Sequence, residues 1–476
     1  MGSNPTSTAE SGAVSDFGVL TGELNLTSRT FRKVIGWDSA GEANRLSTRG
    51  RRGERVFGPQ GTGFFLFLMV VFAALLVWVA LTKQVVFRVL AACLAFLPAM
   101  AFGIAAVNKF YDYYQTWGGM ISDLTGQGVS SIPKYAAAGV GPNKNFDKNI
   151  GRVTSQAEDA QVGYLFQTSV TGVRSHITRD VYVYLPPQYF QKPYLHTKFP
   201  VIELLHGSPG NPQAWVDVMG VIPTFLNLLE TRPSDAAVLV MPDTDGGTQY
   251  GLQCLNDPGG IQDMTFVALD VPDAIARIAR VQPPGQAWGL AGYSEGGYCT
   301  ANIALQFPSR WGAAGVMSGY FSPIDSQVPE GSKPGAKPEQ VNVFRGHPAL
   351  RLLNSPQYYV TRVPVNDLLP TFWLAAGAED SSDVTAAKNF RQLLETRVAS
   401  VPLVIIPGGG HQGSVWRAAL VPMLNWMTPQ LAVQAEKADL AAARAAARAA
   451  AKAAAQRRAH AAKSRRPSSQ ISPAKH

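Results

Sequence analysis

The sequence predicts an α/β fold in which a mostly parallel central sheet carries helices on both faces, preceded by a pair of apolar helices. Three observations predict it. Short apolar runs alternate with amphipathic helical patterns between about residues 163 and 428, as in parallel strands joined by crossover helices. A G-x-S-x-G sequence follows one of these runs at 292–296. Two uncharged stretches, 64–81 and 89–107, precede the alternating region.

Composition divides the chain into five segments. Residues 1–62 are rich in Ser, Thr and Gly and become basic toward their end, and we expect them to be disordered. Residues 63–108 contain the two apolar stretches, and residues 109–162 look like a linker that begins with aromatic side chains. A globular domain over 163–430 and a basic tail rich in Ala, Arg and Lys over 431–476 complete the chain.

Both apolar stretches are long enough to cross a membrane. Residues 64–81 and 89–107 carry no charged side chain and are separated by a short link that contains Lys83 and Arg88. A span needs about 20 apolar residues, and these stretches start too far into the chain for a cleaved signal peptide. A buried helical hairpin in a soluble core is the alternative. We predict a membrane-anchored protein with a transmembrane helical hairpin.

The sequence gives conflicting signals about the side of the membrane on which the domain lies. Five arginines between residues 45 and 55 precede the first stretch, and the positive-inside rule places them in the cytoplasm. Two crossings would then return the domain to the cytoplasm. A disulfide between Cys254 and Cys299 would instead favour an exported setting, and two buried free thiols are the alternative. We expect an extracytoplasmic domain at the cell membrane.

The globular domain has eight predicted strands. The first two, near residues 163–170 and 180–185, are rich in aromatic and β-branched residues, as in an antiparallel pair. The other six are short apolar runs at 201–205, 237–241, 287–291, 313–317, 372–376 and 403–406. Helical patterns separate most of them, at 213–230, 265–279, 297–305, 382–396 and 414–427.

The G-x-S-x-G sequence lies between a predicted strand and a predicted helix. In Gly292-Tyr293-Ser294-Glu295-Gly296-Gly297 the strand ends at the turn, and the helix begins at Gly297. In this context the sequence is typical of a nucleophile elbow, where small residues flank a serine whose hydroxyl is exposed above the sheet. An ordinary glycine-rich turn would match the letters alone, but the flanking elements favour Ser294 as a nucleophile.

A serine nucleophile needs a base, and the base needs an acid to orient it. In the α/β-hydrolase fold the partners follow in the order Ser, Asp/Glu, His, each on a loop after a later strand. His411 follows the last predicted strand within a glycine run, and we predict it as the base. The acid is expected on the loop after the strand at 372–376. Asp380 is favoured there, with Glu379 second and Asp383 third.

An oxyanion hole needs backbone N–H groups aimed at the developing charge. One is expected from Glu295, the residue after the nucleophile. The other is expected from the loop His206-Gly207-Ser208-Pro209-Gly210, with Gly207 and Ser208 as its donors. His206 is interpreted as a structural residue of this loop, with proton transfer as the alternative.

Several aromatic side chains near the predicted site loops are candidates for lining an acyl pocket. They are Trp215, Tyr250, Tyr298, Tyr320, Phe321 and Trp416. Packing in the hydrophobic core explains each of them equally well.

The positive charge of the chain is concentrated in its tail. Of the formal net charge of +9, residues 431–476 contribute ten Lys/Arg less two acids, or +8, which leaves +1 for the rest. This distribution gives no reason to expect a nucleic-acid partner. Residues 436–466 predict a solvated basic helix, which is either a spacer or is attracted to an anionic surface such as lipid headgroups or acidic wall polymer.

Five motifs, in chain order, resemble those of the esterase D superfamily. They are L-L-H-G-S-P-G, M-P-D-T-D-G-G, C-L-N-D-P-G-G, G-Y-S-E-G-G and G-G-G-H, within about 163–428. That superfamily includes enterochelin esterases, S-formylglutathione hydrolases and actinobacterial mycolyltransferases, and the elbow motif looks nearer the membrane-anchored actinobacterial members. The resemblance implies Ser294 as nucleophile, His411 as base, and Asp380 or Glu379 as acid. The acid departs from the family pattern, since mycolyltransferases are known for a Glu and this loop offers both.

Three functions follow as hypotheses. The first is a membrane-anchored serine esterase that cleaves carboxylic esters through an acyl-enzyme. The second has the same triad chemistry but is an acyltransferase that moves an acyl chain to a sugar or glycerol hydroxyl. The third is a non-catalytic scaffold that binds cell-wall material, and the complete triad argues against it. The expected partners are an acyl-ester substrate and membrane lipid. No cofactor is expected, and Cys and His are too few and too badly spaced for a zinc site.

Overall fold

The computed structural model describes residues 56–125, 159–246, 252–324, 344, 347–364 and 368–464. Contacts divide the chain into residues 1–57 and residues 58–476, and the elements below all lie in the second unit. Residues 1–55 of the segment 1–62 expected to be disordered, much of the expected linker, and Tyr250 lie outside the described residues.

One sheet of eight strands forms the centre of the domain. The strands are β1 (Tyr164–Thr171), β2 (Thr178–Leu185), β3 (Val201–Leu205), β4 (Val238–Pro242), β5 (Gly285–Tyr293), β6 (Trp311–Met317), β7 (Thr371–Gly377) and β8 (Leu403–Ile406). Their order across the sheet is β1-β2-β4-β3-β5-β6-β7-β8. All eight predicted strands are therefore confirmed.

The pairing directions explain the composition of the strands. β2 is antiparallel to both of its neighbours, β1 and β4, and every other pair is parallel. In the central strands β3 and β4 every residue is buried, as expected when helices cover both faces of a parallel sheet. The strand order and the single antiparallel strand confirm the predicted α/β-hydrolase fold.

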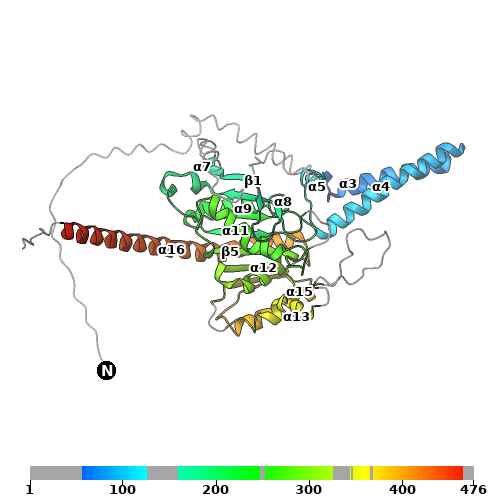
Figure 1. The fold of residues 1–476 in the computed structure, drawn as a ribbon. Coiled ribbons are helices and arrows are strands. Elements are labelled where there is room, and N and C mark those ends of the chain that lie inside the picture. Colours follow the sequence, from blue (N-terminus) through cyan, green and yellow to red (C-terminus); the bar gives the residue numbers. More distant parts are fainter. Residues whose placement is uncertain are drawn as a thin grey trace, which may run out of the picture. The chain divides into compact units, whose positions relative to one another are not determined.

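Helices lie on both sides of the sheet (Figure 1). The α-helices are α3 (Thr62–Leu81), α4 (Val85–Tyr111), α5 (Trp117–Thr125), α7 (Asp159–Val162), α8 (Gln213–Asp217), α9 (Val221–Thr231), α10 (Asp263–Thr265), α11 (Val271–Ile278), α12 (Glu295–Gln306), α13 (Pro348–Leu353), α14 (Pro356–Tyr359), α15 (Ser381–Glu395) and α16 (Gly413–Ser464). Short turns of other helix types are η1 (Pro187–Phe190), η2 (Lys192–Tyr194), η3 (Pro233–Asp235), η4 (Phe266–Asp270) and η5 (Pro308–Arg310).

Two predicted helices are interrupted. The pattern over 213–230 divides into α8 and α9 because Gly220 adopts a left-handed conformation, with φ of 59°, at the start of α9. The pattern over 265–279 passes through the π-helical turn η4 before α11 begins. Hydrophobic periodicity identifies the buried face in both regions, but it does not locate these breaks.

Helix α16 packs on the centre of the sheet through two glycines. A Cβ atom at Gly289 of β5 would lie 2.6 Å from the sulfur of Met427, and one at Gly315 of β6 would lie 2.7 Å from the sulfur of Met423. The absence of side chains at these positions lets the helix approach the strands closely. α16 then continues without a break to Ser464, although a boundary was expected near residue 430. The basic tail is therefore the exposed continuation of a core helix.

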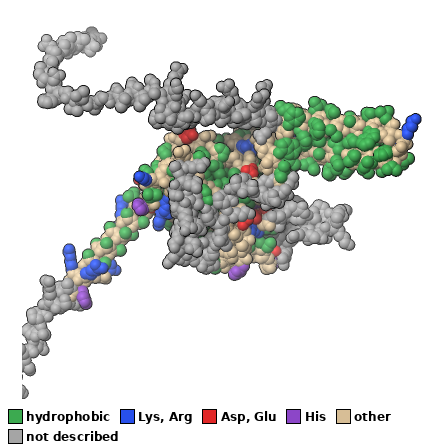
Figure 2. Space-filling model, turned by 90° about the horizontal axis from the view of Figure 1, so that it is seen from above, with side chains coloured by type: hydrophobic (Ala, Val, Ile, Leu, Met, Phe, Trp, Pro, Cys, Tyr) green, Lys and Arg blue, Asp and Glu red, His purple; other side chains and the backbone are tan. Residues whose placement is uncertain are grey.

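Helices α3 and α4 are long and apolar enough to cross a membrane, with hydropathies of 3.0 and 2.3. Only 6% and 22% of their apolar windows are buried, whereas a hairpin in a soluble core would be mostly buried. Figure 2 shows apolar side chains covering this hairpin, with basic side chains at its far end. The two helices are therefore long, apolar and largely exposed in the described part of the chain, and the transmembrane hairpin stays a prediction.

Candidate active site

Ser294 occupies a sharp turn between β5 and α12. Its φ of 55° and ψ of −122° are unfavourable for a residue with a side chain. A Cβ at Gly292 would lie 2.2 Å from the carbonyl oxygen of Gly296, and one at Gly296 would lie 2.2 Å from that of Leu205. Only glycine fits at both positions. The flanking glycines of the motif thus have the steric role expected in a nucleophile elbow, and Ser294 itself is half-buried.

A line of hydrogen bonds joins Ser294, His411 and an aspartate. Nε2 of His411 lies 2.8 Å from the Ser294 hydroxyl, and Nδ1 lies 2.7 Å from Oδ2 of Asp383. Because a carboxylate only accepts, Nδ1 carries the proton and Nε2 is left to receive one from the serine. This arrangement is that of a serine nucleophile with its base and orienting acid.

The carboxylate in contact with His411 is not that of Asp380, which the sequence favoured. The Asp380 carboxylate is 3.9 Å from Nδ1 of His411 and instead caps α15, accepting the backbone N–H groups of Ser382 and Asp383 at 3.0 Å each. Partial burial opposes ionisation, but hydrogen bonds led by the Ser382 hydroxyl lower the pKa of Asp380. Glu379 is exposed. The structure therefore places the third-ranked residue, Asp383, against the histidine.

A local pattern could have identified Asp383. The sequence Asp380-Ser381-Ser382-Asp383 precedes an amphipathic helix, and an Asp in the first of these positions is a preferred helix N-cap. A carboxylate committed to capping is less available to a distant histidine. The fourth residue of the pattern lies within the first turn of α15, and its carboxylate reaches the loop that carries His411.

Glycines let the His411 loop cross the end of β7. A Cβ at Gly377 would lie 2.4 Å from the carbonyl oxygen of Gly410, so the two backbones are in direct contact. Gly408 has a φ of 75°, which favours glycine. The backbone N–H of Glu379 donates to the carbonyl of Gly409 at 3.0 Å. These contacts bring His411 back over the sheet, as the glycine run predicts.

An aromatic column supports the histidine ring. Trp416 meets His411 edge to face at 5.2 Å between ring centroids and stacks on Tyr293 at 4.7 Å. Tyr293 in turn contacts Trp215 at 5.2 Å. Trp215 is fully buried and Trp416 is 5% exposed. Two residues predicted to line an acyl pocket thus pack beneath the catalytic loops, as the alternative of core packing proposed.

Two further predicted pocket residues form a second stack. Tyr298 and Tyr320 lie parallel with 4.7 Å between ring centroids. Tyr298 is fully buried and donates to the carbonyl of Asn354 at 2.7 Å. Tyr320 is partly exposed, and its hydroxyl donates to Oε1 of Gln253 at 3.2 Å. Another predicted pocket residue, Phe321, is 4% exposed and stacks on Phe390 at 4.0 Å between ring centroids. Of the five described candidates, Tyr320 is the one with surface left for a substrate.

The predicted oxyanion loop lies against the nucleophile. A Cβ at Gly207 would lie 3.1 Å from the Cβ of Ser294. Nδ1 of the buried His206 donates to the carbonyl of Gly207 at 2.9 Å, and Nε2 accepts the backbone N–H of Thr244 at 3.1 Å. Both ring nitrogens therefore hydrogen-bond to backbone, one in the loop of Gly207 and the other in the loop of Thr244. His206 therefore has the structural position that the sequence analysis favoured, and Ser208 follows Gly207 in the loop.

The side chain of Glu295 connects the turn at Ser294 to the segment that begins at Gln253. This contact was not predicted from the sequence. Its side chain is buried beside the nucleophile and accepts the backbone N–H of Gln253 at 2.9 Å, and the carboxylate of Asp245 lies near enough to act on it electrostatically. Burial first, and then the charge of Asp245, raise the pKa of Glu295 well above its ordinary range.

The predicted disulfide is present next to this connection. Cys254 and Cys299 are joined, which links the residue after Gln253 to α12. The side-chain amide of Gln253 also exchanges two hydrogen bonds of 2.8 Å with the backbone of Ile324. Together these bonds hold the residues from 253 onward against the helix that follows the nucleophile.

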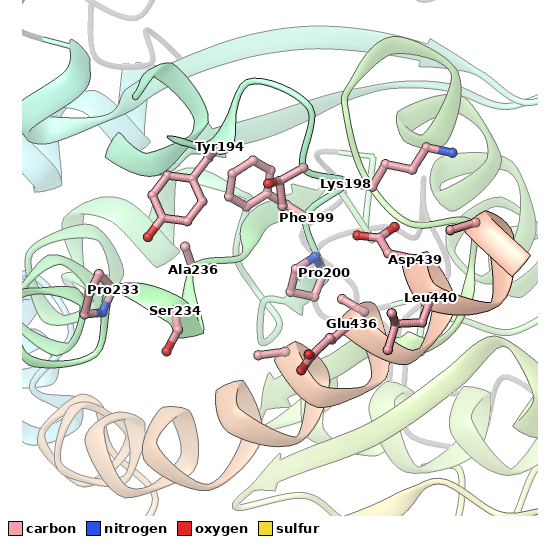
Figure 3. A pocket seen from close by; sticks show the side chains of 14 residues that line it. Tyr194, Lys198, Phe199, Pro200, Pro233, Ser234, Ala236, Glu436, Asp439 and Leu440 are labelled. Carbon is pink, nitrogen blue, oxygen red and sulfur yellow. The ribbon is translucent and has the colours of Figure 1, made fainter. Parts of the chain in front are cut away.

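One hollow of the molecule is lined by residues other than Ser294, His411 and Asp383. This hollow of about 460 Å³ lies where β3 begins, with Tyr194, Phe199 and Pro200 on one side and Asp439 and Leu440 of α16 on the other (Figure 3).

The described residues hold one cluster whose side chains bring three potential metal ligands within 4.8 Å of one another, namely Asp380, Asp383 and His411. Hydrogen bonds already join Asp383 to His411 and Asp380 to the backbone of α15.

Comparison with known proteins identifies the family. Residues 176–427 match the model of a family described as "Putative esterase". The match covers more than half of the chain and includes Ser294, Asp383 and His411. The chain belongs to this esterase family. The predicted resemblance to the esterase D group is thereby confirmed, and the protein is a hydrolytic enzyme of the esterase type.

Individual relatives are distant. An uncharacterised protein of Corynebacterium glutamicum is 26% identical over 359 residues, which cover 73% of this chain and 77% of the relative. A ferulic acid esterase structure is 21% identical, with a TM-score of 0.46, over 56% of this chain and 98% of its own. S-formylglutathione hydrolase from Staphylococcus aureus is 16% identical, with a TM-score of 0.46, over 56% of this chain and 99% of its own.

Proposed function

We propose that this esterase is a membrane-anchored serine enzyme that cleaves carboxylic esters through an acyl-enzyme on Ser294. The observation that carries the proposal is the line of hydrogen bonds from the Ser294 hydroxyl through His411 to Asp383, at 2.8 Å and 2.7 Å. A serine hydroxyl is a weak nucleophile until an adjacent base accepts its proton.

The first half of the reaction acylates the enzyme. Oγ of Ser294 attacks the ester carbonyl carbon while Nε2 of His411 takes the hydroxyl proton, and Asp383 stabilises the resulting imidazolium. The backbone N–H groups of Glu295 and of the loop at Gly207 and Ser208 receive the negative charge that forms on the carbonyl oxygen. When the intermediate collapses, the carbon–oxygen bond to the alcohol breaks and the alcohol leaves with the proton from His411.

The second half releases the acyl chain. A water molecule gives a proton to Nε2 of His411 and attacks the acyl carbon. The bond between that carbon and Oγ of Ser294 then breaks, and His411 returns the proton to Oγ, which frees the acid and regenerates Ser294. In the acyltransferase alternative, a sugar or glycerol hydroxyl takes the place of this water with the same residues. The outcome depends on whether the closed site excludes water. Hydrolysis is our first proposal, because esterase activity is the description of the family.

We propose that α3 and α4 anchor the enzyme in the cell membrane with the domain on the extracytoplasmic side. The mostly exposed apolar surfaces of these helices support insertion. The Cys254–Cys299 disulfide supports the extracytoplasmic side, because disulfides persist in oxidising compartments.

The exposed part of α16 is a candidate for contact with an anionic envelope surface. Lys437, Arg444, Arg448, Lys452 and Arg458 are exposed, and at 100° per residue they fall within about one third of the helix circumference. A stripe of one sign is suited to attraction by lipid headgroups or an acidic polymer, at about 1 kcal/mol for each charge near an anionic membrane.

One assay tests the catalytic proposal and separates its alternatives. Full-length protein in detergent is given p-nitrophenyl butyrate with and without glycerol or a sugar as acceptor, beside Ser294→Ala. The proposal predicts release of p-nitrophenol and butyrate by the wild type alone. Formation of butyryl acceptor without free butyrate would assign the transferase. No release and no acyl-enzyme in the wild type would support the scaffold.

A further inference from the structure

The end of the second apolar helix runs directly into the domain. Phe110 and Tyr111, the last residues of α4, are 74% and 48% exposed. The next residue, Asp112, has a φ of 47° and ends the helix with its N–H bonded to the carbonyl of Asn108. The Asn108 side chain then bonds both the N–H and the carbonyl of Tyr114, at 2.7 Å and 2.9 Å. This turn is therefore held by the helix itself, in a region where a linker was expected.

An ion pair attaches this turn to the first part of α16. The carboxylate of Asp112 pairs with Arg417, and both side chains are 20% exposed. Arg417 also donates to the carbonyl of Val218 at 3.1 Å. A Cβ at Gly413 would lie 2.3 Å from the carbonyl oxygen of Asp112, so the two backbones are in contact. Arg417 follows Trp416, whose ring supports His411.

The same turn contacts the predicted oxyanion loop. A Cβ at Gly210 would lie 3.4 Å from the hydroxyl of Tyr113. At the other end of that loop, Gly207 lies against Ser294. The turn after α4 therefore touches both the loop beside the nucleophile and the helix that follows the base. At the start of α3, Phe64 meets Trp117 of α5 at 4.8 Å, so the adjacent end of the hairpin is joined to the same region.

The length of α4 limits how far from the hydrocarbon core the turn after α4 contacts the domain. The 27 residues of α4 span about 40 Å at 1.5 Å each, and a hydrocarbon core is about 30 Å thick. If α4 crosses the bilayer, its end lies no more than about 10 Å beyond the core. The edge of the active site is then at headgroup level, where the ester groups of membrane lipids also lie.

We infer that Ser294 acts on acyl esters that reside in the same bilayer as α3 and α4, and that these substrates enter the site from the membrane. This inference rests on the proposed function, and it deepens it by naming the substrate class. A tethered site at headgroup level meets bilayer esters at a high local concentration. A water-soluble ester gains nothing from this attachment.

A comparison of substrates held in the enzyme's own bilayer and in separate bilayers tests the inference. Full-length enzyme is placed in phosphatidylcholine nanodiscs, and p-nitrophenyl palmitate is added either to these discs or to separate discs without enzyme. Soluble p-nitrophenyl butyrate has the same leaving group and serves as the reference. We expect palmitate ester in the enzyme's disc to react about 100-fold faster than in separate discs. Equal rates would overturn the inference.

Variants of the attaching ion pair provide the second arm. Asp112→Lys places two cations together and should lower turnover of palmitate ester in the enzyme's disc by about tenfold or more, while butyrate turnover changes little. The charge exchange Asp112→Arg with Arg417→Asp should restore part of the loss. Arg391→Glu breaks an exposed ion pair of α15 and is the matched control. An equal loss for both esters in Asp112→Lys would overturn the inference by assigning the pair a purely structural role.

The two proposals fail in distinguishable ways. If the wild type turns over neither ester, the proposed esterase function fails. If it turns over butyrate normally and shows no preference for palmitate ester in its own disc, the function stands and only the membrane-substrate inference is lost.

Discussion

At the scale of single residues, the environment of each carboxylate decides its role. Asp380 and Asp383 are three positions apart on one loop, and His411 is within reach of both. Asp380 is held by the backbone of α15, whereas Asp383 is directed at the histidine. The resemblance to known families implied Asp380 or Glu379, because the expected position was counted from the end of β7. Because the Asp380 carboxylate caps α15, it is Asp383 that hydrogen-bonds to His411.

Substitution separates the two aspartates. Asp383→Asn should lower kcat by about 10⁴-fold, because the amide no longer holds the productive histidine tautomer. Asp380→Ala should cost about 1 kcal/mol of folding free energy through the lost cap and lower kcat much less. Steady-state hydrolysis and thermal unfolding of the full chain measure the two effects. The opposite pattern, with Asp380→Ala inactive and Asp383→Asn near normal, would return the role to Asp380.

Glu295 should make stability depend on pH. Burial, and then the charge of Asp245, raise the pKa of Glu295 in the folded protein, so the folded protein retains this proton to higher pH than the unfolded chain, which releases it above the ordinary pKa of 4.5. Stability from this group is therefore present below pH 4.5 and is lost as the pH rises toward the raised pKa, with a slope of at most about 1.4 kcal/mol per pH unit.

The variant Glu295→Gln removes this titration. Relative to the wild type, its unfolding temperature should improve as the pH rises from about 5 to about 8, because glutamine needs no proton to remain buried. Differential scanning fluorimetry across this range provides the measurement, and Glu395→Gln at an exposed position is the control. Parallel pH profiles for the wild type and Glu295→Gln would show that Glu295 is ionised in the folded protein.

At the scale of elements, backbone contacts place the site. β5, β7 and β8 end at the same edge of the sheet, so the loops that carry Ser294, Asp383 and His411 meet there, as parallel strands require. The alternation of apolar runs and helical patterns was sufficient to predict the six strands from β3 to β8, and aromatic and β-branched residues predicted β1 and β2. It was not sufficient to predict that Gly220 divides α8 from α9, or that α16 extends through the tail, since helix breaks and extensions depend on packing and on single residues.

The disulfide should stabilise the contact between α12 and the segment at Gln253. Cys254 and Cys299 are 45 residues apart. Removal of a native disulfide of this kind should lower the free energy of unfolding by about 2–5 kcal/mol. The double variant Cys254→Ser with Cys299→Ser should therefore unfold at a lower temperature, and reductant should have the same effect on the wild type. Unchanged unfolding temperatures in both tests would contradict a stabilising disulfide.

At the scale of the whole molecule, the apolar hairpin and the esterase domain form a single unit. The two apolar stretches were evident in the sequence from length and charge alone. Their attachment through Asp112 and Arg417 was not, because these residues are 305 positions apart and nothing local marks them as partners. The arginines that precede α3 favour a cytoplasmic domain after two crossings, whereas the Cys254–Cys299 disulfide favours an extracytoplasmic domain. We base our proposal on the disulfide.

Fusions at the C-terminus test the side of the membrane. If the domain is extracytoplasmic, alkaline phosphatase joined after His476 should be active, because it requires export to form its disulfides. Green fluorescent protein joined at the same position and exported unfolded should be dark. A fluorescent fusion together with an inactive phosphatase would place the domain in the cytoplasm.

The central claim is that Ser294 is the nucleophile of an esterase. The most direct measurement is to treat the full-length protein with a fluorophosphonate, digest it and locate the modified peptide by mass spectrometry. The account predicts one stoichiometric adduct on Ser294, absent after heat denaturation and in His411→Ala. A reactive wild type with the adduct on another residue, or a folded wild type that hydrolyses esters without forming an adduct, would contradict it.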